Sequence, residues 1–201
     1  MTSVTISPKD VSELRARTGA GMMDCKRALE EAGGHMEKAS EILRKKGIAK
    51  AEKRTGKTAS QGVIVSYLHH NGQVGALVEL NCETDFVART EEFQQLAREI
   101  ALHVASADPI GVNPEDVPAE VLERERRIAE EQVAQEDKPE NIRAKIVDGK
   151  LKKFVAERTL TEQLYVKDDK KTVGQLVKEA SGKLGETISV RRFARFKIGE
   201  A

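Results

Sequence analysis

The first 47 residues carry three groups of apolar positions at helical spacing. Ser7 and Pro8 are typical of a helix start, because serine caps orphan N–H groups and proline fits the first helical position. Gly33-Gly34 and Gly47 are typical of helix ends. The pattern therefore predicts three short helices packed as a small bundle, the third ending at Gly47. The apolar positions are Val11 and Leu14; Met22, Cys25, Leu29 and Ala32; and Met36, Ala39, Ile42 and Leu43.

The period changes from helical to strand-like at residue 62. Every second position over 63–67 is occupied by Val63, Val65 or Tyr67, and the positions between them would point to the opposite face of a strand. The same alternation is found over 74–80. Asn71-Gly72 between these runs is a strong signal for a hairpin turn. Two antiparallel strands are therefore expected, followed by an amphipathic helix over 93–104.

The rest of the chain predicts further helices and strands. A charged helix is expected over 119–136, another helix starts near Pro139, a short strand covers 160–166, and Thr172 caps the next helix. The last strand, 187–198, places Ile188, Val190, Ala194, Phe196 and Ile198 on one side. Arg192 and Phe193 break this alternation, so a bulge or a second buried face is expected there. The fold class is α+β, with a helical bundle before a core with a small antiparallel sheet packed by helices.

Composition excludes several classes. The 201 residues include 34 basic and 33 acidic ones, and this near balance argues against a protein that mainly wraps nucleic acid. No apolar run approaches the roughly 20 residues that span a bilayer, so no membrane association is expected. The first ten residues lack the features of a secretory signal. Cys25 and Cys82 cannot form a disulfide framework, and a cytoplasmic location is expected.

Charge is unevenly distributed along the chain. The stretch from residue 44 to residue 58 contains seven basic residues and one acidic residue. This excess of positive charge predicts an exposed basic linker or a helix extension. We divide the chain into a three-helix domain at 1–47, a linker at 48–61, and an α+β core at 62–201. The basic linker and the arginines of the last strand are candidate phosphate contacts, but aromatic stacking platforms are scarce. A solvated charged surface is favoured over a specific nucleic-acid site.

No constellation for catalysis or cofactor binding is found. His69 and His70 are adjacent in a strand, so they are expected on opposite faces, where they could not bind one metal. Cys25 and Cys82 are expected to be buried structural thiols. Thr18-Gly19-Ala20-Gly21 lies between helices and lacks the strand that a phosphate loop needs. We therefore expect no cofactor, no metal and no direct nucleotide binding.

The segment Asn81-Cys82-Glu83-Thr84-Asp85-Phe86-Val87 follows the second strand and has two interpretations. Spacing alone favours Asp85 as a helix cap and Phe86 as a core anchor. Alternatively, the two residues form an exposed loop tip, where a large ring in a polar surround suits a partner protein. Met22 and Met23 are adjacent in the second helix, so one is expected to face the core and the other solvent. The exposed thioether would suit a groove on a partner protein.

Several stretches together resemble the bacterial translation elongation factor Ts family, in its short form. The resemblance extends in order over essentially the whole chain. It is carried by Arg15-Ala16-Arg17-Thr18-Gly19-Ala20-Gly21-Met22-Met23-Asp24-Cys25-Lys26-Arg27-Ala28-Leu29, Asn81-Cys82-Glu83-Thr84-Asp85-Phe86-Val87-Ala88, Lys171-Thr172-Val173-Gly174-Gln175-Leu176 and Arg192-Phe193-Ala194-Arg195-Phe196.

The resemblance implies a guanine-nucleotide exchange factor for elongation factor Tu in protein biosynthesis, not an enzyme with its own chemistry. Thr84, Asp85, Phe86 and Val87 match the segment that disturbs the Mg²⁺ site of the GTPase. Arg15, Met22 and Met23 match contacts of the N-terminal domain, which resembles a ubiquitin-associated (UBA-like) bundle. His69 or His70 matches a further contact with elongation factor Tu.

The short form of the family also implies a homodimer, in which two chains together supply the doubled core of longer members. Phe193 on the last strand is a candidate for the dimer interface. The alternative function is a ribosome- or RNA-associated basic binding protein that would depend on Lys45, Lys46, Lys53 and Arg54.

Overall fold

The computed structural model describes residues 6–53, 58–135 and 139–200. Two compact units are formed from interleaved parts of the chain. The first comprises residues 1–62, 81–94 and 177–189, and the second comprises 63–80, 95–176 and 190–201. The division at 1–47, 48–61 and 62–201 stays a prediction, and residues 54–57 of its linker lie outside the described residues.

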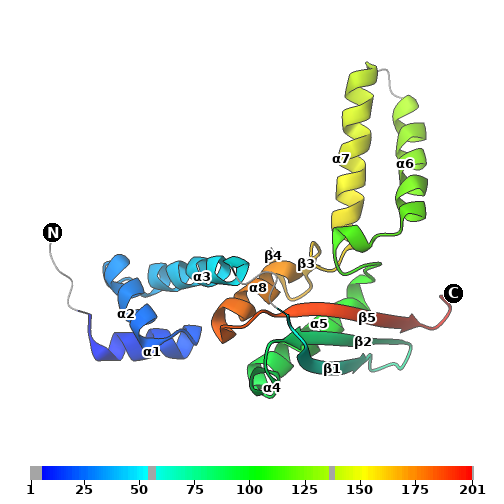
Figure 1. Ribbon diagram of the computed structural model, residues 1–201. Coiled ribbons are helices and arrows are strands. Elements are labelled where there is room, and N and C mark those ends of the chain that lie inside the picture. Colours follow the sequence, from blue (N-terminus) through cyan, green and yellow to red (C-terminus); the bar gives the residue numbers. More distant parts are fainter. Residues whose placement is uncertain (1–5, 54–57, 136–138, 201) are drawn as a thin grey trace. The chain divides into compact units, whose positions relative to one another are not determined.

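Three helices form a bundle within the first unit: α1 (Pro8–Thr18), α2 (Met22–Glu31) and α3 (Met36–Lys53) (Figure 1). Ser7 caps α1 by accepting the Asp10 N–H, and the Asp10 carboxylate accepts the Ser7 N–H in return. Gly19 ends α1 with φ +67°, a conformation that glycine adopts without strain. The buried core of the bundle comprises Val11, Leu14, Cys25, Ala28, Leu29, Ala32 and Ala39.

The expected end of the third helix at Gly47 is wrong. Helix α3 continues through Gly47 to Lys53, so the helix extension that the basic stretch allowed is present. A glycine inside a helix costs only about 1 kcal/mol relative to alanine, a cost that packing elsewhere can offset. The first part of the predicted linker is therefore helical.

A three-stranded sheet has the order β1-β2-β5 and is formed by β1 (Gln61–Leu68), β2 (Val74–Cys82) and β5 (Ser189–Lys197). The turn between β1 and β2 contains Gly72 at φ +68°, whose N–H donates to the His69 carbonyl. Alternation is regular on β2, where Ala76, Val78 and Leu80 are buried and Leu77 is exposed. The α+β class with a small antiparallel sheet is confirmed.

Strand β5 changes its buried side partway along. Val190 is buried, Arg191 and Arg192 are both exposed, and Phe193 and Arg195 are then partly buried. The expected shared side of Val190 and Phe196 is therefore wrong, because Phe196 is 69% exposed. Two consecutive exposed residues are typical of the bulge that the sequence allowed.

Helix α5 (Glu91–Ala107) begins after the short helix α4 (Asp85–Ala88). Its buried residues recur at spacings of three and four, as an amphipathic helix requires. The Arg195 Nε donates to the Ala105 carbonyl at 3.2 Å, which places the last turn of α5 against the inner side of β5. The buried apolar residues of α5 are Phe93, Leu96, Ala97, Ile100, Ala101, Val104 and Ala105, and His103 is buried with them.

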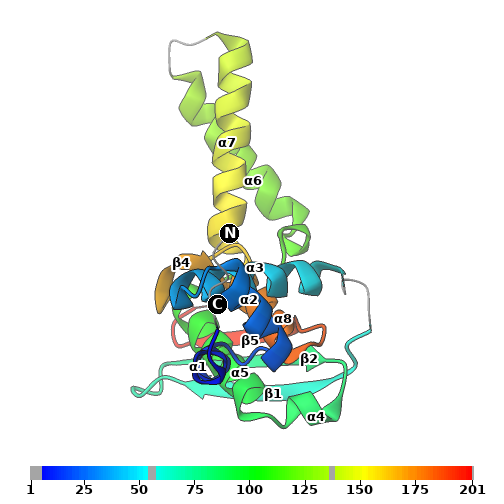
Figure 2. The same ribbon diagram turned by 90° about the vertical axis from the view of Figure 1, so that its left-hand side faces the viewer.

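Helices α6 (Ala119–Ala134) and α7 (Glu140–Arg158) lie side by side as an antiparallel pair (Figures 1 and 2). A short 3₁₀ helix, η1 (Pro114–Asp116), precedes them. In the described part of the two helices, Ala129, Val133 and Val147 form a small buried cluster, and the partly buried Ile146 and Leu151 pack against it.

A second, two-stranded sheet pairs β3 (Leu164–Tyr165) with β4 (Asp168–Thr172). The expected strand over 160–166 is therefore shorter, and β4 was not predicted, because its sequence DDKKT has no apolar alternation. Helix α8 (Val173–Leu184) follows, and Thr172 caps it as predicted by accepting the Gln175 N–H at 3.2 Å.

Candidate partner-binding site

The segment Thr84–Val87 forms a surface projection between β2 and α5. Asp85–Ala88 is a four-residue helix, α4, and Thr84 rather than Asp85 is its cap, accepting the Val87 N–H. Phe86 is 79% exposed, so the interpretation of Phe86 as a core anchor is wrong. A phenyl ring left in water forgoes the burial energy that usually places it inside. The projection therefore presents an apolar side chain without a partner in its own fold.

Glu186 holds the start of this projection. Its carboxylate accepts the backbone N–H groups of Glu83 at 3.1 Å and Thr84 at 3.0 Å, and the Thr84 hydroxyl at 2.5 Å. A further hydrogen bond joins the same two stretches, because the Glu83 carboxylate accepts the Thr187 N–H at 2.7 Å. Hydrogen bonds to a charged acceptor are stronger than neutral ones. Two stretches of chain about a hundred residues apart are thereby joined beside Phe86.

Cys82 supports the same turn from inside. Its buried thiol donates to the Thr84 carbonyl at 3.1 Å. Burial raises the pKa of the Cys82 thiol, and the charge of Glu186 raises it further. The thiol therefore stays protonated near neutral pH and acts as a hydrogen-bond donor. Cys25 is also buried, so the expected burial of both cysteines is confirmed.

The other side of the projection carries an exposed ion pair and is held by a second cap. The Asp85 carboxylate pairs with Arg89 at 2.9 Å, one helical turn later. The Thr90 hydroxyl donates to the Val87 carbonyl at 2.7 Å and accepts the Phe93 N–H, so it caps α5. Caps at Thr84 and Thr90 leave little freedom between them. Phe86 is thus exposed on a well-defined backbone.

Arg15, Met22 and Met23 lie on the helical bundle. Arg15 is exposed on α1, and Met22 and Met23 are 51% and 63% exposed at the start of α2. The expectation that one methionine faces the core is wrong, because Gly21 caps α2 and leaves its first turn outside the core. Two adjacent exposed thioethers form an adaptable apolar surface.

His69 and His70 lie in the turn after β1. Their ring centroids are 4.1 Å apart, so the expected placement on opposite faces is wrong. The reason is that β1 ends at Leu68, and the alternation of a strand no longer applies. Tyr67 Oη lies 3.1 Å from His69 Nδ1. The two rings form a small polar group at the hairpin turn.

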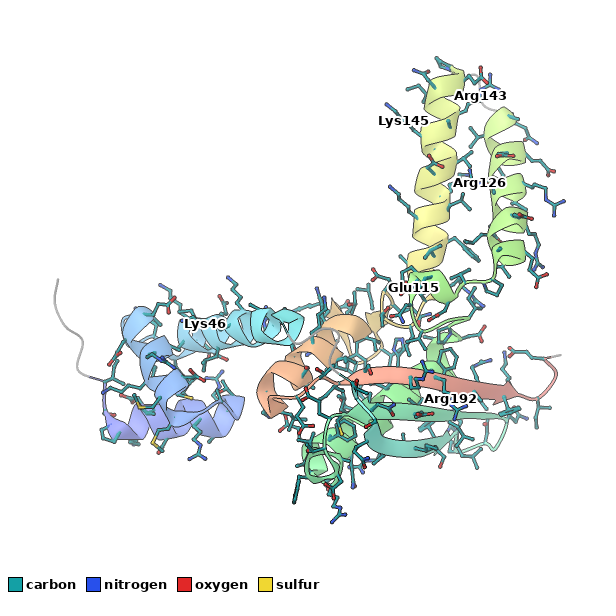
Figure 3. All side chains as sticks on the ribbon, in the orientation of Figure 1. Lys46, Glu115, Arg126, Arg143, Lys145 and Arg192 are labelled. Atoms are coloured by element: carbon teal, nitrogen blue, oxygen red, sulfur yellow. The ribbon has the colours of Figure 1, made fainter. Side chains whose placement is uncertain are left out.

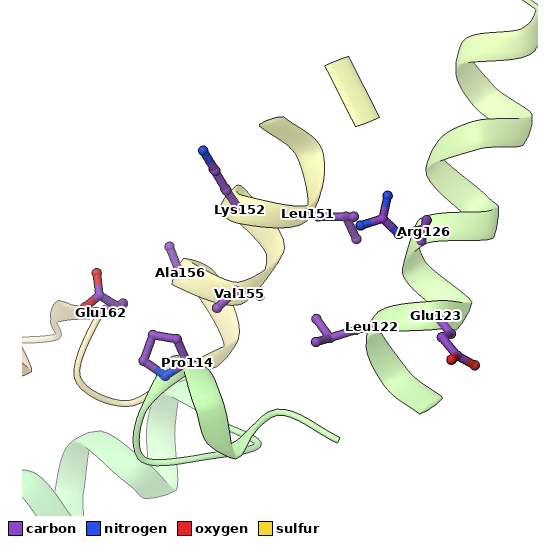
Figure 4. A pocket seen from close by; sticks show the side chains of 9 residues that line it. All are labelled: Pro114, Leu122, Glu123, Arg126, Leu151, Lys152, Val155, Ala156 and Glu162. Atoms are coloured by element: carbon purple, nitrogen blue, oxygen red, sulfur yellow. The ribbon is translucent and has the colours of Figure 1, made fainter. Parts of the chain in front are cut away.

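The described residues contain no cluster of three or more His, Cys, Asp or Glu side chains that could hold a metal ion. A hollow of about 410 Å³ lies at the base of the α6–α7 pair (Figure 4). Its apolar side chains, Leu122, Leu151 and Val155, lie beside the charged Arg126 and Glu123, and its lining residues include no serine, cysteine or histidine. In the described part of the chain, no helix is long and apolar enough to cross a bilayer.

The sequence pattern did not indicate Glu186 as a residue of this site. The carboxylate stands after Gly185, which ends α8 at φ +75°, and nothing in the local sequence connects it with Thr84. Only the fold brings the two together. The pairing of Glu83 with the Thr187 N–H is equally invisible in the sequence.

A capped projection with an exposed phenylalanine, and a helical bundle with exposed methionines, are typical of a protein that acts by binding a partner through its surface. The family model for elongation factor Ts matches residues 8–200, and the chain belongs to that family. Elongation factor Ts of Thermosipho melanesiensis is 56% identical over 97% of this chain and 100% of its own length. That of Desulfosudis oleivorans is 53% identical over 98% and 99%, and that of Thermotoga maritima is 56% identical over 97% of each chain.

Proposed function

We propose that this protein is a guanine-nucleotide exchange factor for elongation factor Tu. Membership of the elongation factor Ts family supports the partner and the process. The observation that carries the mechanism is the exposure of Phe86 on a segment that Glu186 and two threonine caps hold in place. A preorganised apolar side chain can enter a partner at low entropic cost.

In the proposed mechanism, Thr84, Asp85, Phe86 and Val87 disturb the Mg²⁺ site of the GTPase. Phe86 inserts between helices near the nucleotide, and Asp85, in the first turn of α4, fixes the segment. Mg²⁺ neutralises charge on the β-phosphate, so its displacement weakens the binding of GDP. GDP then dissociates, and GTP can bind in its place.

Exchange by this route needs differential binding and no bond chemistry by this chain. If the factor weakens GDP binding, GDP weakens binding of the factor to the same degree. The proposal therefore includes no cofactor, no metal and no direct nucleotide binding by this chain. It also places the protein in the cytoplasm, where translation elongation takes place.

We assign Arg15, Met22 and Met23 to a second contact with elongation factor Tu. Their exposure on one end of the helical bundle supports this assignment. The neighbouring His69 and His70 rings are assigned a further contact, which rests on the family resemblance alone.

We also propose a homodimer formed through the outer face of the three-stranded sheet. Ile64 and Leu68 on β1, Leu77 on β2 and Phe196 on β5 are 68%, 70%, 46% and 69% exposed. They share a face, because Arg192 on the outer side of β5 pairs with Glu79, which alternates outward with Leu77 on β2. Such an apolar face is typical of an interface. Phe196 therefore replaces the half-buried Phe193 as the interface candidate.

The RNA-binding alternative has less support, because several of the basic side chains are already paired with carboxylates. Lys46 pairs with Glu31 at 2.5 Å and Arg192 with Glu79 at 2.7 Å. Figure 3 labels the two basic side chains, Lys46 on α3 and Arg192 on β5. Arg195 pairs with Asp108 and Glu200. Pairing lowers the local positive potential that phosphate binding needs. Arg54 and the side chain of Lys53 lie outside the described residues.

The test is stopped-flow release of fluorescent GDP from elongation factor Tu. The wild-type protein is expected to accelerate release strongly, and Phe86→Ala to lose most of the acceleration with its fold intact. Val166→Ala, which shortens an exposed apolar side chain elsewhere, is the matched control. No acceleration by the wild type would refute exchange and favour the RNA alternative, which retention on RNA and its loss in Lys45→Ala/Lys46→Ala would then test.

A further inference from the structure

The C-terminal half of α8 contacts the helical bundle through two glycines. A Cβ atom placed on Gly182 would lie 2.5 Å from the carbonyl carbon and oxygen of Gly47 and 2.7 Å from its Cα. Cβ atoms do not approach backbone so closely, so α8 and α3 cross at a distance that only glycine at position 182 allows. Both residues belong to the first compact unit.

The crossing is asymmetric. A Cβ atom on Gly47 would lie 3.7 Å from Gly182 Cα, which is an ordinary van der Waals distance. Alanine is therefore tolerated at position 47 and not at position 182 without movement of one helix. The two positions form a natural pair of test variant and control.

A second close contact accompanies this crossing, because a Cβ atom on Gly19 would lie 2.1 Å from Cε of Lys183 on α8. Arg44 on α3 pairs with Glu179 on α8 at 3.8 Å, and its side chain is 60% exposed. A hollow of about 970 Å³ is lined by both the bundle and α8. Exposed ion pairs contribute little. The close glycine contact thus limits how near α3 and α8 can come to each other.

The same short stretch leads directly to the Phe86 projection. Ser181, beside Gly182, donates its hydroxyl to the Glu186 carbonyl, and Gly185 donates its N–H to the Ser181 carbonyl at 2.9 Å. The Glu186 carboxylate then binds the Thr84 N–H. Lys183 pairs with Glu92 at the start of α5 at 2.6 Å. Residues 179–187 therefore contact the bundle at one end and the projection at the other.

We propose that Gly182 and Glu186 are positioning residues for nucleotide exchange, which hold the helical bundle and the Thr84–Val87 segment at one fixed spacing. The proposal rests on the proposed function, in which both surfaces bind the same GTPase molecule. Two linked contacts bind far more tightly than either alone only when their spacing matches the partner. The stretch 179–187 sets that spacing within a single chain.

The kinetic test compares Gly182→Ala with Gly47→Ala over a range of factor concentrations. For Gly182→Ala we expect the half-saturating concentration for GDP release to rise about tenfold or more, with little change in the maximal rate. Loss of Phe86 would instead lower the maximal rate. Gly47→Ala is expected to behave as the wild type, and thermal unfolding checks that both variants are folded.

A distance measurement tests the same residue without the partner. Spin labels on Glu13→Cys and Phe86→Cys occupy exposed positions, whereas Cys25 and Cys82 are buried and will label poorly. Double electron–electron resonance is expected to give a narrow distance distribution in the otherwise wild-type protein. Gly182→Ala should shift or broaden it, and Gly47→Ala should not.

The possible results distinguish failure of the positioning role of Gly182 from failure of the proposed exchange function. An unchanged distribution in Gly182→Ala would overturn the proposal, as would a changed distribution with unchanged exchange kinetics. If the wild-type protein fails to accelerate GDP release, the exchange function itself is refuted. The distance measurement then still decides whether Gly182 fixes the spacing.

Discussion

The Glu186 carboxylate accepts the Thr84 N–H at 3.0 Å, although the two residues are 102 positions apart in the chain. Thr84 also donates its hydroxyl to Glu186 while accepting the Val87 N–H. One side chain thus connects the end of α8 with the cap of α4. The position of the exposed Phe86 therefore depends on the hydrogen bonds between Glu186 and Thr84.

Glu186→Ala should destabilise the protein and reduce exchange. The substitution leaves the Glu83 N–H, Thr84 N–H and Thr84 hydroxyl without their acceptor, at a cost of about 1–3 kcal/mol. Denaturant unfolding measures the loss. Glu186→Gln retains an acceptor oxygen and should lie between the wild type and Glu186→Ala in both stability and exchange. Equal stability of all three proteins would show that the connection contributes nothing.

Met23→Ala should weaken binding to elongation factor Tu with little effect on stability. Its side chain is 63% exposed and contributes little to the bundle core. Truncating an interface anchor typically costs more than about 1 kcal/mol, or roughly fivefold in affinity. Calorimetric titration provides the measurement, and Lys26→Ala on the same helix is the control. Unchanged affinity would remove Met23 from the contact surface.

The oligomeric state should depend on Phe196. Light scattering of the wild type at micromolar concentration is expected to give the mass of two chains, and Phe196→Asp should give that of one. A charge buried in an apolar interface is costly unless paired. Leu164→Asp, at a position 59% exposed outside the three-stranded sheet, should stay dimeric. A monomeric wild type contradicts the dimer proposal.

Stability should fall in mild acid because of His103. This side chain is fully buried, its Nε2 lies 3.0 Å from Gln163 Oε1, and its Nδ1 accepts the Val166 N–H at 3.3 Å. Burial lowers the pKa of His103 below its ordinary value of 6.5. The unfolded chain therefore binds a proton first, and stability is lost as pH falls from about 6.5 toward the lower folded pKa.

The pH dependence is measured by unfolding in denaturant at pH 7.5, 6.5 and 5.5. His103→Gln should have a flatter profile than the wild type over this range, by at most about 1.4 kcal/mol per pH unit. The exposed His35 offers the control His35→Gln, which should keep the wild-type profile. Identical profiles for all three proteins would exclude His103 as the source.

Local signals predicted much of the fold. Ser7 and Pro8 marked the start of α1, Asn71-Gly72 marked the hairpin turn, and Thr172 marked the start of α8. Each of these residues hydrogen-bonds or shapes the backbone only a few positions away. The local sequence is therefore sufficient to predict these helix starts and this turn. Strand β4 lacked apolar alternation and was missed, because pairing with β3 defines it.

Features that depend on tertiary contacts could not be predicted. Helix α3 passes through Gly47, where local propensity favours an end, and Gly182 packs against it there. The exposure of Phe86 contradicts its apolar character, and the pattern of residues left an exposed loop tip as the less favoured interpretation. Glu186 had no local signal at all, since its partners are distant in sequence.

The most direct test of the central claim is the Mg²⁺ dependence of GDP release. In millimolar Mg²⁺, the wild-type protein should accelerate release from elongation factor Tu strongly, and Phe86→Ala only weakly. In excess EDTA, the GTPase has already lost the ion that stabilises GDP, so the two proteins should differ little. An acceleration that is equally large in EDTA, or that Phe86→Ala retains in Mg²⁺, would contradict the claim that the Phe86 segment acts through the Mg²⁺ site.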